Sequence, residues 1–87
     1  MKTFPLEITS PDGSLFTGDV VKLSVRGIEG ELAVMAGHIP FVTSVCAGEF
    51  HVDMEDGSVR YGTTEGGLLT VSADSVIFLS GSAVWSE

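Results

Sequence analysis

Glycine and proline interrupt this chain so often that few stretches are long enough to form a helix. Eleven glycines and three prolines leave most uninterrupted stretches near eight residues, as at 19–26 and 49–56. Globular helices average about 11–12 residues and strands about 5–6, so these intervals favour strands. Val, Ile and Thr together supply 22 residues, and their β-branched side chains pack well on a pleated surface. The sequence therefore predicts an all-β fold.

Alternation of apolar and polar residues supports strands locally. Residues 49–55 and 20–26 each place an apolar side chain at every second position, which is the period of a strand with one buried face. Five side chains are expected in the core: Leu23, Val25, Phe50, Val52 and Phe78. Segments 68–71 and 76–79 are apolar at nearly every position, so we expect these two strands to be covered on both faces.

Turn signals divide the strands. Pro11-Asp12-Gly13, Gly66-Gly67 and the polar cluster at 72–75 mark three turns or bends. Asp56-Gly57 predicts a two-residue type I′ hairpin, which would return Val59 and Tyr61 to the same core. Short strands with regular turns indicate a small β-sandwich, with residues 1–87 forming a single domain.

Charge and length exclude several classes of function. Twelve acidic residues against four basic ones give a net charge of −8, and the bases are scattered, which argues against nucleic-acid binding. No apolar run approaches the roughly 18–20 residues of a membrane span, and the N-terminus lacks the apolar run of a signal peptide. Cys46 is the single cysteine, so an internal disulfide is impossible. An acidic chain of this kind suits basic protein partners.

Catalytic and cofactor signals are weak. The two histidines, His38 and His51, have no recognisable nucleophile or phosphate-binding motif around them. Glu49, His51 and Asp53 share one face of a strand, but a spacing of about 6.6 Å is too wide for all three to hold Zn²⁺ at about 2 Å. We therefore expect a protein that is not an enzyme and that binds no metal or cofactor.

Residues 27–43 carry the strongest hint of function. Glycine and proline break this segment repeatedly, so we interpret it as a shaped loop between two strands. Glu29 and Glu31 would be exposed there with His38 close in sequence, forming an acidic tip. The loop is either a functional surface or a merely structural turn, and the residues alone leave both open.

Three stretches together resemble a known family. They are ITSPDG at 8–13 with LFTG at 15–18, GEL at 30–32 leading to GHIPFVT at 37–43, and EGGLLTV at 65–71. The second is similar to the family pattern G-E followed by G-H-x-P-L-L-T, and the third to S-G-G-F-L-E-V. In this combination the chain resembles the N-terminal β-sandwich domain of the ATP synthase epsilon subunit, which is called delta in mitochondria.

The resemblance implies two packed five-stranded, mainly antiparallel sheets. It also implies a non-catalytic subunit of the central rotor that docks on the gamma subunit and on the polar loops of the c-ring, and so couples rotation to ATP synthesis. By the same resemblance, Glu29, Gly30, Glu31 and His38 belong to a loop facing the c-ring. Ser10, Val42 and Thr43 match positions near the gamma subunit.

Further expectations concern the length and the location. The family usually continues into a C-terminal helical hairpin, which in some members binds ATP, whereas this sequence stops at Glu87. We therefore expect no hairpin and no ATP binding by this chain. The resemblance implies a peripheral location on the cytoplasmic face of a bacterial inner membrane, or the equivalent organellar face, through the complex only.

Two other functions compete with the rotor subunit. A stand-alone ligand- or carbohydrate-binding sandwich would use an aromatic platform, for which Tyr61 and Trp85 are the candidates. An enzyme would use His38 or His51 as a base, without an identified nucleophile.

Overall fold

The computed structural model describes residues 2–86, and these residues form ten strands and no helix. The strands are β1 (Phe4–Ser10), β2 (Gly13–Val20), β3 (Lys22–Gly27), β4 (Gly30–Met35), β5 (Phe41–Val45), β6 (Gly48–Asp53), β7 (Val59–Thr64), β8 (Gly67–Val71), β9 (Val76–Ser80) and β10 (Ala83–Trp85). The all-β prediction is confirmed. No helix long and apolar enough to cross a membrane occurs in this part of the chain.

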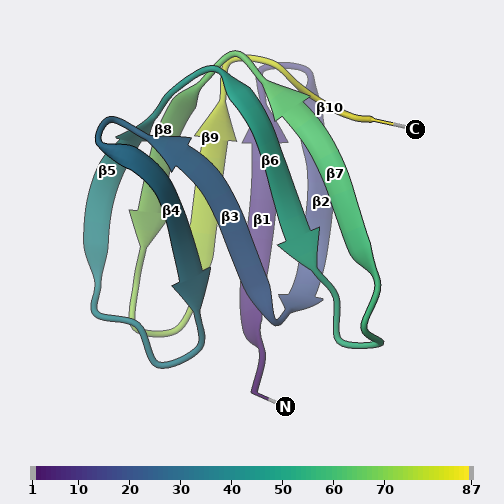
Figure 1. The fold of residues 1–87 in the computed structure, drawn as a ribbon, viewed down its shortest axis with the longest axis vertical. Coiled ribbons are helices and arrows are strands. Elements are labelled where there is room, and N and C mark those ends of the chain that lie inside the picture. The colour runs from purple at the N-terminus through teal and green to yellow at the C-terminus, as the bar shows by residue number, and fades with distance from the viewer. Residues whose placement is uncertain (1, 87) are drawn as a thin grey trace.

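Two five-stranded sheets pack face to face (Figure 1). Sheet A has the order β2-β1-β9-β8-β5, and sheet B has the order β10-β7-β6-β3-β4. All neighbouring strands are antiparallel except β1 and β9, which are parallel. The turns and loops that connect the strands lie in two groups, at opposite ends of the sandwich.

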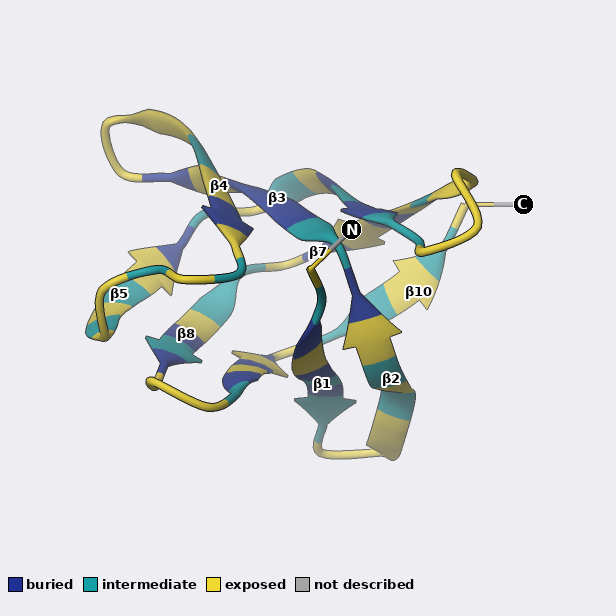
Figure 2. Cartoon of the chain, turned by 90° about the horizontal axis from the view of Figure 1, so that it is seen from below, coloured by how far each residue is buried: buried dark blue, intermediate teal, exposed yellow. Residues whose placement is uncertain are grey.

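The core lies between the sheets, where the inward side chains of both meet. The five side chains expected there from the sequence are at most 1% exposed. Phe50 of sheet B meets Phe78 of sheet A edge to face, with ring centroids 6.0 Å apart. Along most strands buried and exposed residues alternate, as Figure 2 shows. The alternation of apolar and polar residues in the sequence thus gives each sheet one buried inner face and one exposed outer face.

The β6–β7 hairpin differs from the predicted two-residue turn. Met54 accepts a hydrogen bond from the backbone N–H of Gly57, and Gly57 has a φ of +93°, whereas no described non-glycine residue has a positive φ. This is the three-residue loop with a glycine bulge rather than a type I′ turn. The extra residue shifts the register by one, so Val59 and Tyr61 face outward instead of entering the core.

Gly62 faces inward as a result of that register. It pairs with Phe50 across the two strands, and the Phe50 ring lies over it. A β-carbon at position 62 would lie 2.6 Å from Cζ of Phe50 and 2.8 Å from the carbonyl oxygen of Val84. The absence of a side chain is therefore what makes room for the largest ring at the centre of the core.

Trp85 closes the side of the sandwich where β2 and β10 form the edges. Its ring contacts Phe50 at 5.6 Å and Phe16 of β2 at 6.1 Å between centroids. The guanidinium of Arg60 lies 3.9 Å from the centre of the same ring, in a cation–π contact. The terminal aromatic residue thus folds back on the core and joins the two sheets.

From the close packing of Phe50 and Val84 over Gly62 we predict that a larger residue at position 62 destabilises the fold. Gly62→Ala should lower the free energy of unfolding by about 1–3 kcal/mol, because the new methyl group collides with buried atoms. Urea denaturation measures the change. Gly81→Ala is the matched control, since a β-carbon there would meet the carbonyl oxygen of Gly66 at an ordinary 3.7 Å. Equal losses in the two variants would contradict this account of the core.

The hairpin loop makes a second prediction, on pH. The Ser58 hydroxyl at 2.6 Å and the Ser58 backbone N–H at 2.9 Å donate to the Asp56 carboxylate, and they lower its pKa below the ordinary 3.8. Because the folded pKa is depressed, the contribution to stability is complete above the unfolded pKa and is lost as the pH falls through the folded one.

Ser58→Ala should therefore raise the pKa of Asp56 towards its ordinary value. Carboxyl NMR titration of the folded protein measures this shift. Ser14→Ala removes a hydroxyl from β2, away from this loop, and should leave the pKa of Asp56 unchanged. An unaltered Asp56 pKa in Ser58→Ala would show that the serine is not the cause.

Candidate functional site

The outer face of sheet A carries an apolar surface that no other part of the described chain covers. Ile77 and Leu79 of β9 alternate with buried Val76 and Phe78, and Leu68 of β8 is likewise the outward neighbour of a buried leucine. The strand registers bring these side chains together across the middle of the sheet, where Leu68 pairs with Leu79. We call Val42, Leu68, Ile77 and Leu79 the apolar patch; they are 37–62% exposed.

The apolar patch corrects the expectation that 68–71 and 76–79 are covered on both faces. Their inward residues are sealed, but nothing in residues 2–86 covers their outward ones. Sequence reasoning missed this surface because an apolar run looks the same whether its second face is buried in its own domain or left for a partner. An apolar run predicts that both faces of its strand are covered, but it does not show whether the same domain or a partner covers them.

The three predicted gamma contacts lie differently around this patch. Val42 is part of it and is 62% exposed. Ser10 ends β1 and, with Leu68 and Leu79, lines a shallow hollow of about 490 Å³ at one end of the patch. Thr43 is the next residue after Val42 on β5, so its side chain points to the other face of the strand, towards Ile28 and Glu29.

An acidic turn forms at the tip of the β3–β4 hairpin. Glu29 and Glu31 are exposed there, and Ile28 between the strands is 74% exposed. Gly30 adopts a φ of +127°, a backbone conformation that side chains rarely allow, so glycine is required to turn the chain into β4. We call residues 28–31 the acidic turn.

His38 is not part of the acidic turn, so the prediction of one loop over 27–43 is wrong. β4 occupies Gly30–Met35 and, at about 3.3 Å per residue, carries the chain roughly 20 Å to the opposite end of the sandwich. His38 follows there, with its ring 5.7 Å from that of Phe4, edge to face. Its Nδ1 is buried without a hydrogen-bond partner among the described residues.

Glycine at 27, 30 and 37 caused this error. Frequent glycines suggested a segment without regular structure, but Gly27 ends β3, Gly30 begins β4 and Gly37 lies in the turn after β4. The residues between them, Glu31 to Met35, pair with β3 in unbroken register. Tertiary pairing thus overrides the local signal.

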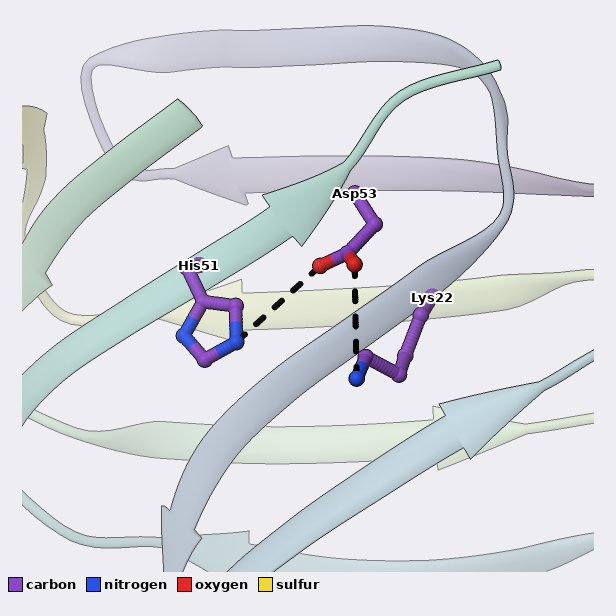
Figure 3. Close-up of polar contacts among 3 residues, drawn as sticks. All are labelled: Lys22, His51 and Asp53. Atoms are coloured by element: carbon purple, nitrogen blue, oxygen red, sulfur yellow. Dashed lines mark ion pairs between the residues drawn. The ribbon is translucent and has the colours of Figure 1, made fainter. Parts of the chain in front are cut away.

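The outer face of sheet B carries a row of polar side chains on β6 and β3, beside the exposed Val59, Tyr61 and Val84. His51 lies on β6 beside Tyr61, and its Nε2 is 4.0 Å from Asp53 Oδ1. Lys22 Nζ approaches the other oxygen of Asp53 at 4.0 Å, so one carboxylate serves two basic groups, as Figure 3 shows. Across residues 2–86 no group of three metal-ligating side chains converges. Glu49, the third candidate metal ligand on this face of β6, is exposed at the end of this row.

Trp85 and Tyr61 are the two candidates for an aromatic platform that would bind a ligand. Trp85 is packed between Phe16, Phe50 and Arg60, so its ring is committed to closing the sandwich. Tyr61 is 48% exposed but stands beside a single histidine ring. Neither forms the broad flat surface that a stacked sugar needs.

The fold and its surfaces define a small β-sandwich with an open apolar face and an acidic turn, which are features suited to docking. A family model described as the β-sandwich domain of the ATP synthase delta/epsilon chain matches residues 3–86. The chain belongs to this family.

Named relatives share the family across this whole length. The chain is 40% identical to the sodium-ion-specific ATP synthase epsilon chain of Acetobacterium woodii over 86 residues, which is 99% of this chain and 65% of that one. It is 36% identical to the ATP synthase epsilon chain of Caldicellulosiruptor saccharolyticus, covering 100% of this chain and 63% of the relative. It therefore spans just under two thirds of the length of these curated relatives.

Solved structures show the same fold. A chain in the mitochondrial ATP synthase of Euglena gracilis, solved with F1 and the c-ring, superimposes with a TM-score of 0.90 at 27% identity, over 95% of this chain and 53% of that chain. A chain from the central stalk and c-ring of the Tetrahymena thermophila mitochondrial ATP synthase has a TM-score of 0.79 at 12% identity, over 95% of this chain and 66% of that chain, and shows likeness of fold alone.

Proposed function

We propose that this chain acts as a non-catalytic subunit of the central stalk of an F-type ATP synthase. Membership of the delta/epsilon β-sandwich family over residues 3–86 carries the proposal. The surfaces are consistent with it, because an open apolar face and an acidic turn bind partners without making or breaking bonds. In this role the subunit docks on the gamma subunit and the c-ring and helps couple proton-driven rotation to ATP synthesis.

The apolar patch is the proposed gamma-docking surface. Burying apolar area stabilises an interface by about 25 cal/mol per Å², and four large side chains lie on adjoining strands here. Val42 belongs to the patch and Ser10 borders it, so both would contact gamma directly. Thr43 would reach the same partner only along the edge of β5, because its side chain points the other way.

The acidic turn is the proposed c-ring contact. Glu29, Gly30 and Glu31 stand at one end of the sandwich, where two exposed carboxylates would meet basic side chains on the polar loops of the ring. Such complementarity fixes register and partner choice more than raw affinity. His38 lies at the opposite end, so a ring surface that meets the acidic turn does not reach it at the same time.

The proposed role also sets the location. The subunit would be peripheral on the cytoplasmic face of a bacterial inner membrane, or on the equivalent organellar face. It would associate with the membrane only through the complex, and it would need no cofactor of its own.

Leu68→Asp tests the gamma-docking surface. A charge in the middle of the apolar patch should reduce co-purification with the matching gamma subunit at least tenfold, because the carboxylate must lose its water on docking. Val84→Asp is the matched control, since Val84 is 57% exposed on the outer face of sheet B. If both variants bind gamma like the parent protein, docking occurs elsewhere.

Glu31→Lys tests the c-ring contact. Charge reversal should weaken binding to isolated c-ring and lower coupled ATP synthesis in the reconstituted complex, while the change in unfolding free energy stays below about 0.5 kcal/mol. Glu55→Lys makes the same charge change in the β6–β7 loop at the other end of the sandwich. Equal effects of the two variants would point to net charge rather than a specific contact.

A further inference from the structure

β4 leaves one side of its backbone open. It is the outermost strand of sheet B and pairs with β3 alone, in an unbroken register from Lys22↔Met35 to Gly27↔Gly30. An edge of this kind presents unpaired N–H and C=O groups to any chain that can lie alongside it. Only alternate residues of β4 direct these groups towards the open side.

A hydrogen bond on the far side of β3 shows which residues of β4 these are. The carbonyl of Arg26 accepts from the backbone N–H of Cys46 at 2.8 Å, so it points away from β4. Arg26↔Glu31 is therefore the kind of antiparallel pair that exchanges no ladder bonds, and such pairs alternate along the strands. It follows that Glu31, Ala33 and Met35 turn their N–H and C=O groups towards the open side.

The other three edges carry a short strand, a register shift or a proline, and β4 has none of these, although it carries one charge, at Glu31. β10 is only three residues long, β2 is distorted by a register shift opposite Ile8 and Thr9, and β5 begins directly after Pro40. Short length, bulges and proline are common ways to block an edge. The six residues of β4 include no lysine, proline or register shift.

A groove runs beside this edge. Ile28, Leu32 and Thr43 line a hollow of about 500 Å³ together with the residues of the acidic turn. A strand added to β4 would turn every second side chain towards this groove. Its other side chains would lie next to Glu31, Ala33 and Met35, which are all exposed.

We propose that the free edge of β4 binds an extended segment of a partner polypeptide as an additional strand of sheet B. Main-chain hydrogen bonds would supply affinity, and apolar side chains in the groove would supply specificity. Glu29 and Glu31 flank the start of the strand, so the segment carries lysine or arginine there. A second copy of this chain fits poorly, because each copy has a net charge of −8.

A short peptide tests this proposal without any other subunit. The probe is an acetylated nonapeptide that alternates valine with threonine and carries lysine at two of the threonine positions. Added to the ¹⁵N-labelled protein, it should slow amide exchange at Glu31, Ala33 and Met35 and leave the amides of β10 unchanged. The same peptide with glutamate in place of lysine should bind at least tenfold more weakly.

Ala33→Pro removes the central outward N–H and should reduce peptide binding at least tenfold. Ala33→Thr is the matched control, because it keeps the N–H. No slowing of exchange in the parent protein, equal binding by the two variants, or self-association through β4 in place of peptide binding would each overturn the proposal. Gamma co-purification of Ala33→Pro should remain normal, because the apolar patch lies on the other sheet, so failure here is distinguishable from failure of the proposed function.

Discussion

The edge-to-face contact of Phe50 with Phe78 joins the two sheets at the centre of the core. Phe50 comes from the centre of sheet B and Phe78 from the centre of sheet A, and both are fully buried. The contact depends on Gly62, whose missing side chain leaves space for the Phe50 ring. Trp85 then packs on the same ring from the open edge. These two rings are the largest fully buried side chains among the fourteen apolar residues that form the buried core of the described chain.

Because the inner faces of the two sheets are buried against each other, each sheet has one exposed outer face on which a partner could bind. On sheet A that face is apolar around Leu68 and Leu79, whereas on sheet B it is a polar row that includes Lys22, His51 and Asp53. Two similar sheets thus acquire different chemical surfaces. A partner can distinguish the two faces, because removing a polar face from water costs more free energy than removing an apolar one.

Much of the fold could be predicted from the sequence because strand alternation is a local signal. The burial of Leu23, Val25, Phe50 and Val52 follows from period two, although Ser24 between the first two is buried as well. One error arose where the prediction depends on a count of one residue. At Asp56-Gly57 the loop has three residues rather than two, and this alone turns Tyr61 from the core to the surface. Over 27–43, glycines at the ends of a strand suggested a loop.

The all-β class, five of the core side chains and the family could be predicted from the sequence alone, because these depend on periodicity and on short motifs. The tertiary structure decided which surfaces exist. It separated His38 from Glu31 by the length of β4, it exposed the outer side of an apolar run at Leu68 and Leu79, and it left β4 at the edge of its sheet. These features depend on which strands pair, and pairing joins residues far apart in the chain through contacts that no local pattern encodes.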